Sequence, residues 1–335
     1  MVPFIENFHR FFPILIVPYC TKNDFAANNI VIMTETPESN APDAQQNTDE
    51  APTDSGDSLS SKGSPGNLTS GKSSVTFDEA LVLDRRLGEF VLAIGFFTRL
   101  PVPLDEETAA RPLADASWAF PIAGLIIGLC GSAAIALGIG LNLPPLVLAF
   151  LTISLMVCLT GALHEDGLSD CADGLWSGKD SKERLIIMRD SRIGAFGVIA
   201  LVLMLGLKAA AIAHLLTIAG MWNTVLATLA AASLSRGFLP CIMRLAPLAT
   251  EKGRAADAGN PSQQDMLIAA GLSVLICLLC LGFGTTVLSL FIGGGLCAAL
   301  TVIAINRIGG YNGDVLGAQQ QILDVTTLTI ASAIL

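Results

Sequence analysis

The sequence has 335 residues, of which 52% are hydrophobic and only 14% are charged. Soluble domains carry about 25% charged residues, so this composition excludes an ordinary soluble protein and indicates a membrane protein. The net charge of −10 comes without a basic patch, which excludes a nucleic-acid-binding protein.

Residues 1–76 form an N-terminal extension that differs in composition from the rest. Residues 34–72 are rich in Ser, Pro, Asp, Gly and Thr, and such segments stay disordered because they cannot bury enough apolar surface. Residues 1–32 contain an apolar patch that is too short to span a bilayer. Because Met33 opens the polar tract, we suspect that residues 1–32 reflect a mis-assigned start. The folded domain is expected over 77–335.

An amphipathic helix is predicted from about residue 77 up to Pro101 and Pro103, which end it. Six apolar segments then follow with about the 20 residues that a membrane-spanning helix needs, and a seventh is shorter. They are residues 118–141, 145–163, 195–219, 222–245, 266–282, 285–305 and 325–335. The predicted fold class is all-α, a polytopic transmembrane helix bundle of six to seven spans.

Lys and Arg are distributed unequally between the loops on the two sides of these spans. Bases occur in 84–116, 164–193, 244–265 and 306–324, whereas the short loops around 142–144, 220–221 and 283–284 contain none. Cytoplasmic loops carry the excess of bases in membrane proteins. We therefore expect every motif-bearing loop to face the cytoplasm.

The stretch from Gly161 to Gly194 is the one densely charged part of this apolar chain, and its acids precede its bases. If its first part is helical, Asp166, Asp170 and Asp173 stand at i, i+4 and i+7 and share one face. Carboxylates stacked in this way repel each other unless a divalent cation lies between them, and Mg²⁺ commonly uses one or two carboxylates plus phosphate oxygens. The stretch therefore predicts a Mg²⁺ site followed by a phosphate clamp. The alternative is a solvated loop between two membrane helices.

Several residues outside that face also attract a functional interpretation. Lys208 and Arg236 lie within apolar segments, where a charge is costly and usually points into the bundle. His164 directly precedes the acids and has an ordinary pKa suited to proton transfer near neutrality, although a role in orienting an aspartate is equally compatible. Asp314 lies in a glycine-rich loop, 309–321, where it either completes the metal shell or belongs to a flexible turn.

Four motifs together resemble the cobalamin synthase (adenosylcobinamide-GDP ribazoletransferase) family. They are FFTRLPVP from Phe96, FPIAGLIIG from Phe120, the block HEDGLSDCADG to MRDSRIGAFG from His164, and GGYNGDVLGAQQQ from Gly309. The resemblance begins at about Leu87 and leaves the N-terminal extension outside. The sequence departs from it at Asp324, where the family usually has glutamate, so the role of this residue is open.

The resemblance implies a bacterial inner-membrane enzyme. In its reaction a hydroxyl of α-ribazole, or of its 5′-phosphate, attacks the cobinamide-side phosphorus of adenosylcobinamide-GDP and GMP leaves. It also implies membrane lipid as a partner, and it is compatible with a homo-oligomer or a complex with other cobalamin-assembly enzymes. The residues expected to act are His164, Asp166, Asp170 and Asp173 in catalysis, the three aspartates as Mg²⁺ ligands, and Arg99, Lys179, Arg184, Arg189, Asp190, Arg192, Lys208, Arg236, Asn312 and Asp314 in substrate binding.

Three other interpretations compete with this one. A CDP-alcohol phosphotransferase also binds a divalent metal through clustered aspartates, but its alanine-arginine continuation after the first aspartate pair is missing. A secondary transporter would use Lys208 and Arg236 near the midplane, whereas the dense charge here lies in a loop. A membrane scaffold would leave the acid-then-base order unexplained.

Overall fold

The long apolar segments fold into helices, because a helix satisfies its backbone hydrogen bonds internally where water is absent. The computed structural model describes residues 77–335, with side chains from residue 84. The disorder and the alternative start predicted for 1–76 lie outside this range. In chain order the helices are α3 (Phe77–Phe97), α4 (Glu106–Ala109), the 3₁₀-helix η1 (Leu113–Ala119), α5 (Phe120–Gly140), α6 (Pro145–Thr160), α7 (Leu163–Ser177), α8 (Ser181–Met188), α9 (Ala195–Ile218), α10 (Gly220–Gly237), α11 (Leu239–Leu245), α12 (Arg254–Asp257), α13 (Gln263–Leu288), the π-helix η2 (Ser289–Gly293), α14 (Gly294–Ile308) and α15 (Gly313–Ile334).

Several of these helices are long and apolar enough to cross a membrane, which confirms the predicted all-α membrane protein. In the described part of the chain, four segments pass this test, or five if the bent pair α6 and α7 is one span. The expected number was six to seven. The difference arises because residues 263–308 pass as one segment and because α15, with glutamines in its middle, does not pass. The predicted loop 309–321 is wrong in its second part, since α15 begins at Gly313.

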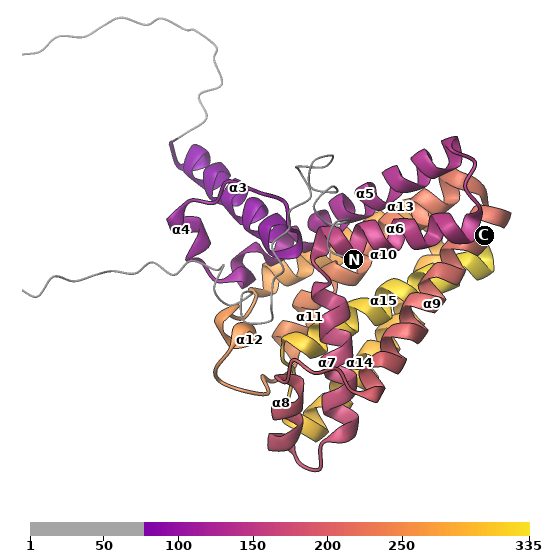
Figure 1. Ribbon diagram of the computed structural model, residues 1–335. Helices are drawn as coiled ribbons and strands as arrows, with labels where there is room; N and C mark the ends of the chain where they lie inside the picture. The colour runs from indigo at the N-terminus through magenta and orange to yellow at the C-terminus, as the bar shows by residue number, and fades with distance from the viewer. Residues whose placement is uncertain (1–76) are drawn as a thin grey trace, which may run out of the picture. The chain divides into compact units, whose positions relative to one another are not determined.

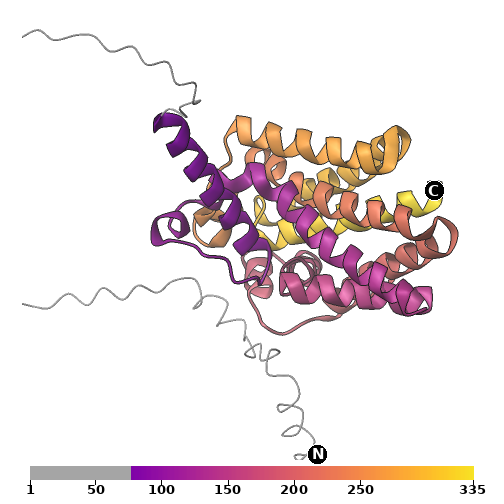
Figure 2. The ribbon, with the colours of Figure 1, turned by 90° about the horizontal axis from the view of Figure 1, so that it is seen from above.

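Helix α10 lies at the centre of the bundle and packs against α5, α13 and α15 (Figures 1 and 2). Small residues permit the close approach of α5. A Cβ on Gly124 would collide with the backbone of Ala232, and one on Gly128 would press on the backbone of Leu229. Such contacts are typical of membrane helices, which associate through van der Waals packing. The side chains of α10 that face α7 and α15 are therefore held in a rigid core.

Helices α6 and α7 meet at a bend of 90°, and Figure 1 shows α7 turning away from α6. Gly161 (φ 64°) and Ala162 (φ 57°) both adopt the left-handed conformation there. The Arg99 guanidinium packs on Gly161, so a Cβ there would have to displace this side chain. Glycine adopts the left-handed conformation without steric cost, and the bend directs the acidic helix α7 away from the apolar α6.

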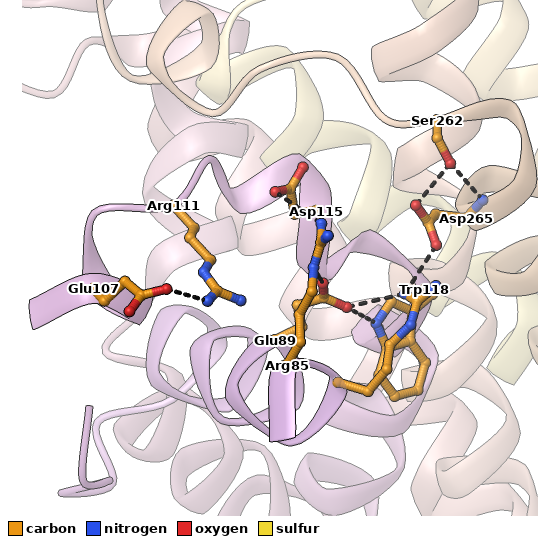
Figure 3. A network of polar contacts seen from close by, with 9 residues as sticks. Arg85, Glu89, Glu107, Arg111, Asp115, Trp118, Ser262 and Asp265 are labelled. Atoms are coloured by element: carbon orange, nitrogen blue, oxygen red, sulfur yellow. Dashed lines mark hydrogen bonds and ion pairs between the residues drawn. The ribbon is translucent and has the colours of Figure 1, made fainter. Parts of the chain in front are cut away.

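A set of charged and aromatic side chains ties α3 to the bundle at one side (Figure 3). Glu89 is 1% exposed, and it accepts hydrogen bonds from Arg85, Arg86 and Trp118 at 2.8–2.9 Å. Arg86 also reaches Asp265 at the start of α13. We call this set the peripheral network, and its members are Arg85, Arg86, Glu89, Asp115, Trp118, Ser262 and Asp265.

Candidate active site

Helix α7 carries the predicted acidic face on a continuous helix from Leu163 to Ser177. Its two internal glycines, which are poor helix formers, each admit a neighbouring element. A Cβ on Gly167 would lie 3.1 Å from the Asp314 carbonyl oxygen of α15, and one on Gly174 would collide with Met188 of α8. The glycines thus serve close packing against the protein's own backbone and side chains.

The side chain of Asp173, which the sequence predicts as a metal ligand, makes structural contacts instead. Its Oδ2 accepts from the Gly194 amide at 2.7 Å, and its Oδ1 accepts from the Gly197 amide at 2.9 Å. These amides belong to the start of α9, where the first backbone N–H groups lack partners within the helix. Asp173 therefore caps α9 with both carboxylate oxygens, a structural use that sequence spacing alone did not indicate.

Asp166 and Asp170 remain on the acidic face, and the start of α15 adds Asp314 to them. Asp166 is exposed and Asp170 is buried, while Asp170 and Asp314 both lie within electrostatic range of the Cys171 thiol. Asn312 holds Asp314 in place, because it caps α15 through the Val315 amide and donates to Asp314 Oδ2 at 2.9 Å. The structure thus places Asp170 and Asp314 near the same thiol, and Asp166 lies one helical turn before Asp170 on α7.

The fit of this group to Mg²⁺ depends on its donor set. Among the residues that the structure describes, no group of three or more His, Cys, Asp and Glu side chains could hold a metal ion by itself. Mg²⁺ does not need three protein ligands, since one or two carboxylates with water and substrate phosphates suffice. Asp170 and Asp314 offer two carboxylates of that kind, whereas both carboxylate oxygens of Asp173 are occupied at the start of α9.

Some of the predicted phosphate-binding residues are exposed, whereas others are engaged with protein partners. Lys179 and Arg189 are exposed in the segment around α8, and Arg99 is exposed beside the α6–α7 bend. Arg184 instead donates to the backbone carbonyls of Arg307 and Lys179.

Arg192 and Asp190 form an exposed pair in the loop that follows α8. Arg192 donates through Nε and Nη2 to the Asp190 carboxylate, with a shortest distance of 2.7 Å. This partner raises the pKa of Arg192 above its ordinary value. The basic residues are therefore not gathered into one clamp.

A second polar cluster lies inside the bundle, between α7, α9, α10 and α15. Lys208 Nζ lies 2.7 Å from Asp324 Oδ2, and both side chains are nearly inaccessible. This pair accounts for Asp324, whose role the sequence left open, and it places Lys208 away from the acidic face. We call this cluster the buried network, and its members are His164, Glu165, Lys208, Ser235, Arg236, Gln320, Gln321 and Asp324.

Hydrogen bonds connect the buried network from α10 to α7. Gln320 donates to Ser235 Oγ at 2.9 Å, and Gln321 donates to both Gln320 Oε1 and Glu165 Oε1 at 3.0 Å. Arg236 lies within electrostatic range of Glu165 and Asp324. The two cations are therefore matched by two carboxylates.

His164 is buried and stacks on Phe97, with ring centroids 5.7 Å apart. The Arg236 guanidinium lies over the same Phe97 ring at 5.9 Å. Both residues were predicted at the site, and both lie in the buried network. Sequence reasoning missed Ser235, Gln320 and Gln321 and gave Glu165 no role, although three successive glutamines in an otherwise apolar helix were a usable signal.

Comparison with known proteins identifies relatives over most of the chain. The model of the family described as cobalamin-5-phosphate synthase matches residues 89–332. The protein named adenosylcobinamide-GDP ribazoletransferase from Bradyrhizobium diazoefficiens is 39% identical over 247 residues, which cover 74% of this chain and 94% of the relative. Those of the same name from Mesorhizobium japonicum and Rhizobium etli are each 41% identical, over 74% and 70% of this chain and 94% and 93% of theirs. No solved structure matches the chain.

The family match covers α7, α15 and both polar clusters between them, so the carboxylate group and the buried network lie within the shared region. The relatives align over nearly their full length, and the family match leaves out residues 1–88 and the last three residues. The chain belongs to the cobalamin-5-phosphate synthase family.

Proposed function

We propose that the chain acts as an adenosylcobinamide-GDP ribazoletransferase, an enzyme of the last step of cobalamin assembly. In this reaction a hydroxyl oxygen of α-ribazole, or of its 5′-phosphate, forms a bond to the cobinamide-side phosphorus of adenosylcobinamide-GDP. The bond from that phosphorus to the bridging oxygen breaks, and GMP leaves with the electron pair. The observation that carries the proposal is that Asp170 of α7 and Asp314 of α15 both lie near Cys171, where the Asp314 backbone packs on Gly167 of α7.

Mg²⁺ is the proposed cofactor, held by Asp166, Asp170 and Asp314. When bound, it would neutralise the charge that builds up on the diphosphate as GMP departs. The original set of Asp166, Asp170 and Asp173 is revised, because Asp173 caps α9. Asn312 contributes by orienting Asp314.

Cationic side chains around this group are proposed to bind the diphosphate oxygens. Arg99, Lys179 and Arg189 are exposed, and arginine's planar fork suits phosphate geometry. Arg192 would have to leave Asp190 to contribute. Because His164 is buried against Phe97, the exposed Asp166 is the better placed acceptor of the nucleophile's proton.

Several long apolar helices make the chain a multi-pass membrane protein. We propose further that 263–308 crosses twice, since 46 residues of helix would be roughly 70 Å long at 1.5 Å per residue, against about 30 Å of hydrocarbon. Gly282, with φ 75° and ψ 177°, breaks the helix and would lie at the turn. The excess of Lys and Arg in the loops with the motifs supports a site at the cytoplasmic face.

The function can be tested with purified enzyme in lipid vesicles supplied with adenosylcobinamide-GDP, α-ribazole and Mg²⁺, with GMP release as the readout. We expect activity that EDTA abolishes and that Asp170→Asn and Asp314→Asn each lower by about 10²-fold or more, as loss of an electrostatic stabiliser typically does. Asp115→Asn, in the peripheral network, is the matched control and should retain activity. Normal turnover in both site variants would refute the metal assignment.

A further inference from the structure

The buried network contacts the acidic helix directly beside its aspartates. Glu165 adjoins Asp166 in the sequence, and its Oε1 accepts from Gln321 Nε2 of α15. Gln321 is tied through Gln320 to Ser235 of the central helix α10. We propose that Glu165 and Gln321 are positioning residues, which fix the first turn of α7 so that Asp166 and Asp170 face Asp314 correctly.

The packing of α7 on α15 explains why position matters here. The two helices touch through backbone: a Cβ on Gly317 would lie 3.1 Å from the Gly167 Cα and 3.2 Å from the His164 carbonyl oxygen. Glycine has no side chain that could fix the register of two helices at such a contact, so side chains beside it must do so. The Glu165–Gln321 hydrogen bond lies at the same interface, so it supplies the register that the glycines lack.

Several polar atoms of the buried network have no partner in the described part of the chain. Glu165 Oε2, Arg236 Nε, His164 Nε2 and Gln321 Oε1 are all buried and have no hydrogen-bond partner among the described residues. Buried polar atoms without partners are rare in native proteins, and each calls for an explanation. Gln319 Oε1 outside the network is also unpartnered there, so the missing partners alone do not distinguish the network. Its distinguishing feature is the contact of Gln321 with Glu165, beside Asp166 on the acidic helix.

The chain provides a closely matched control for Gln321. Gln319 is the same residue type, two positions earlier on α15 and equally buried, but its amide donates to Thr301 of α14. The amide of each glutamine donates two hydrogen bonds, so replacing either residue with methionine removes two and leaves a side chain of similar length. Loss of stability alone should therefore affect both variants alike, whereas loss of positioning should affect only Gln321→Met.

The measurement is Mn²⁺ affinity, followed by electron paramagnetic resonance on full-length enzyme in lipid vesicles with adenosylcobinamide-GDP and no α-ribazole, so that no turnover occurs. We expect Gln321→Met to weaken Mn²⁺ binding about 10- to 100-fold, the usual effect of removing a group that orients a metal ligand. Gln319→Met should stay within about twofold of the parent. Equal changes in the two variants would overturn the inference.

An exchange variant tests the geometry independently. Gln321→Glu alone places a second carboxylate against Glu165 and should weaken Mn²⁺ binding. Adding Glu165→Gln restores one carboxylate and one amide at the same contact, with donor and acceptor reversed, and should recover affinity to within about threefold. Failure of the exchange to recover Mn²⁺ binding would also overturn the positioning role.

This inference rests on the proposed Mg²⁺ site, and Asp170→Asn in the same measurement separates the two. If Asp170→Asn leaves Mn²⁺ affinity unchanged, the metal assignment itself is wrong. If it abolishes binding while Gln321→Met does not weaken it, the metal assignment stands and the positioning role fails.

Discussion

Two buried glutamates in this protein have very different surroundings. Glu89 of the peripheral network accepts a hydrogen bond on Oε1 from Arg85 and two on Oε2, from Arg86 and Trp118 (Figure 3). Glu165 of the buried network accepts one on Oε1 from Gln321, and its Oε2 has no partner among the described residues. One carboxylate is satisfied and the other is not.

The difference indicates what each network is for. The side chains of Arg85 and Arg86 in the peripheral network are 60% and 40% exposed, so water solvates much of their charge. The contacts of this network mainly join α3 to η1 and α13. Lys208 and Arg236 have no such access to water, so they depend on the carboxylates of Asp324 and Glu165 to offset the cost of a charge inside a bundle. The peripheral contacts join helices, whereas the buried network lies against the acidic helix α7.

The largest effect on stability is expected for Asp324→Leu, because it leaves the Lys208 ammonium buried without a partner. Removing one member of a buried ion pair costs about 3–5 kcal/mol. Chemical denaturation in detergent micelles, followed by tryptophan fluorescence, should show a loss of that size in the free energy of unfolding. Adding Lys208→Met removes the orphaned charge and should restore most of it. An Asp324→Leu variant as stable as the parent would refute the ion pair.

The same double variant also decides whether Lys208 binds substrate, as the sequence suggested. If Lys208 only neutralises Asp324, GMP release should return together with stability. A stable but inactive double variant would restore Lys208 to the substrate-binding residues.

Replacing Glu89 with Gln should have a smaller effect. The amide retains one acceptor but loses the charge that Arg85, Arg86 and Trp118 share, and leaving such donors poorly satisfied costs about 1–3 kcal/mol. The melting temperature in detergent should fall, while GMP release per folded enzyme at 25 °C should stay within about twofold of the parent. A large fall in turnover would show that α3 also shapes the site and would remove the contrast between the networks.

Much of the contrast between the two networks could not be predicted from the sequence. The helical class, the acidic face of α7 and the capacity of Asp314 to join it could be predicted, because they depend on hydropathy and on helical spacing. The capping role of Asp173 could not, since its partners Gly194 and Gly197 approach only when α9 folds back.

Tertiary packing also determines which partners the charged residues inside the apolar helices have. Lys208 and Asp324 are far apart in the sequence, and nothing local indicates that they meet at 2.7 Å. The same holds for Glu165 and Gln321. A buried lysine predicts that a partner exists, but only the packing of α9 on α15 identifies it.

The smallest effect is expected where the peripheral network reaches α13. Arg86 Nη1 lies 3.2 Å from Asp265 Oδ1, with the arginine 40% and the aspartate 14% exposed, and half-exposed pairs of this kind contribute about 0.2–1 kcal/mol. Asp265→Asn should therefore lower the free energy of unfolding by roughly that amount in dilute buffer, with turnover unchanged.

Asp265 also lies in the first turn of α13, where a negative charge is favourable on its own account. A double-mutant cycle with Arg86→Gln separates the two contributions, because only the pair interaction appears as non-additivity. That coupling should shrink towards zero in 1 M salt, where the Debye length is about 3 Å. A coupling above about 2 kcal/mol that persists in 1 M salt would mean that the peripheral network is shielded from solvent like the buried one. The contrast between the peripheral and the buried network would then depend only on Glu165, whose Oε2 has no hydrogen-bond partner among the described residues.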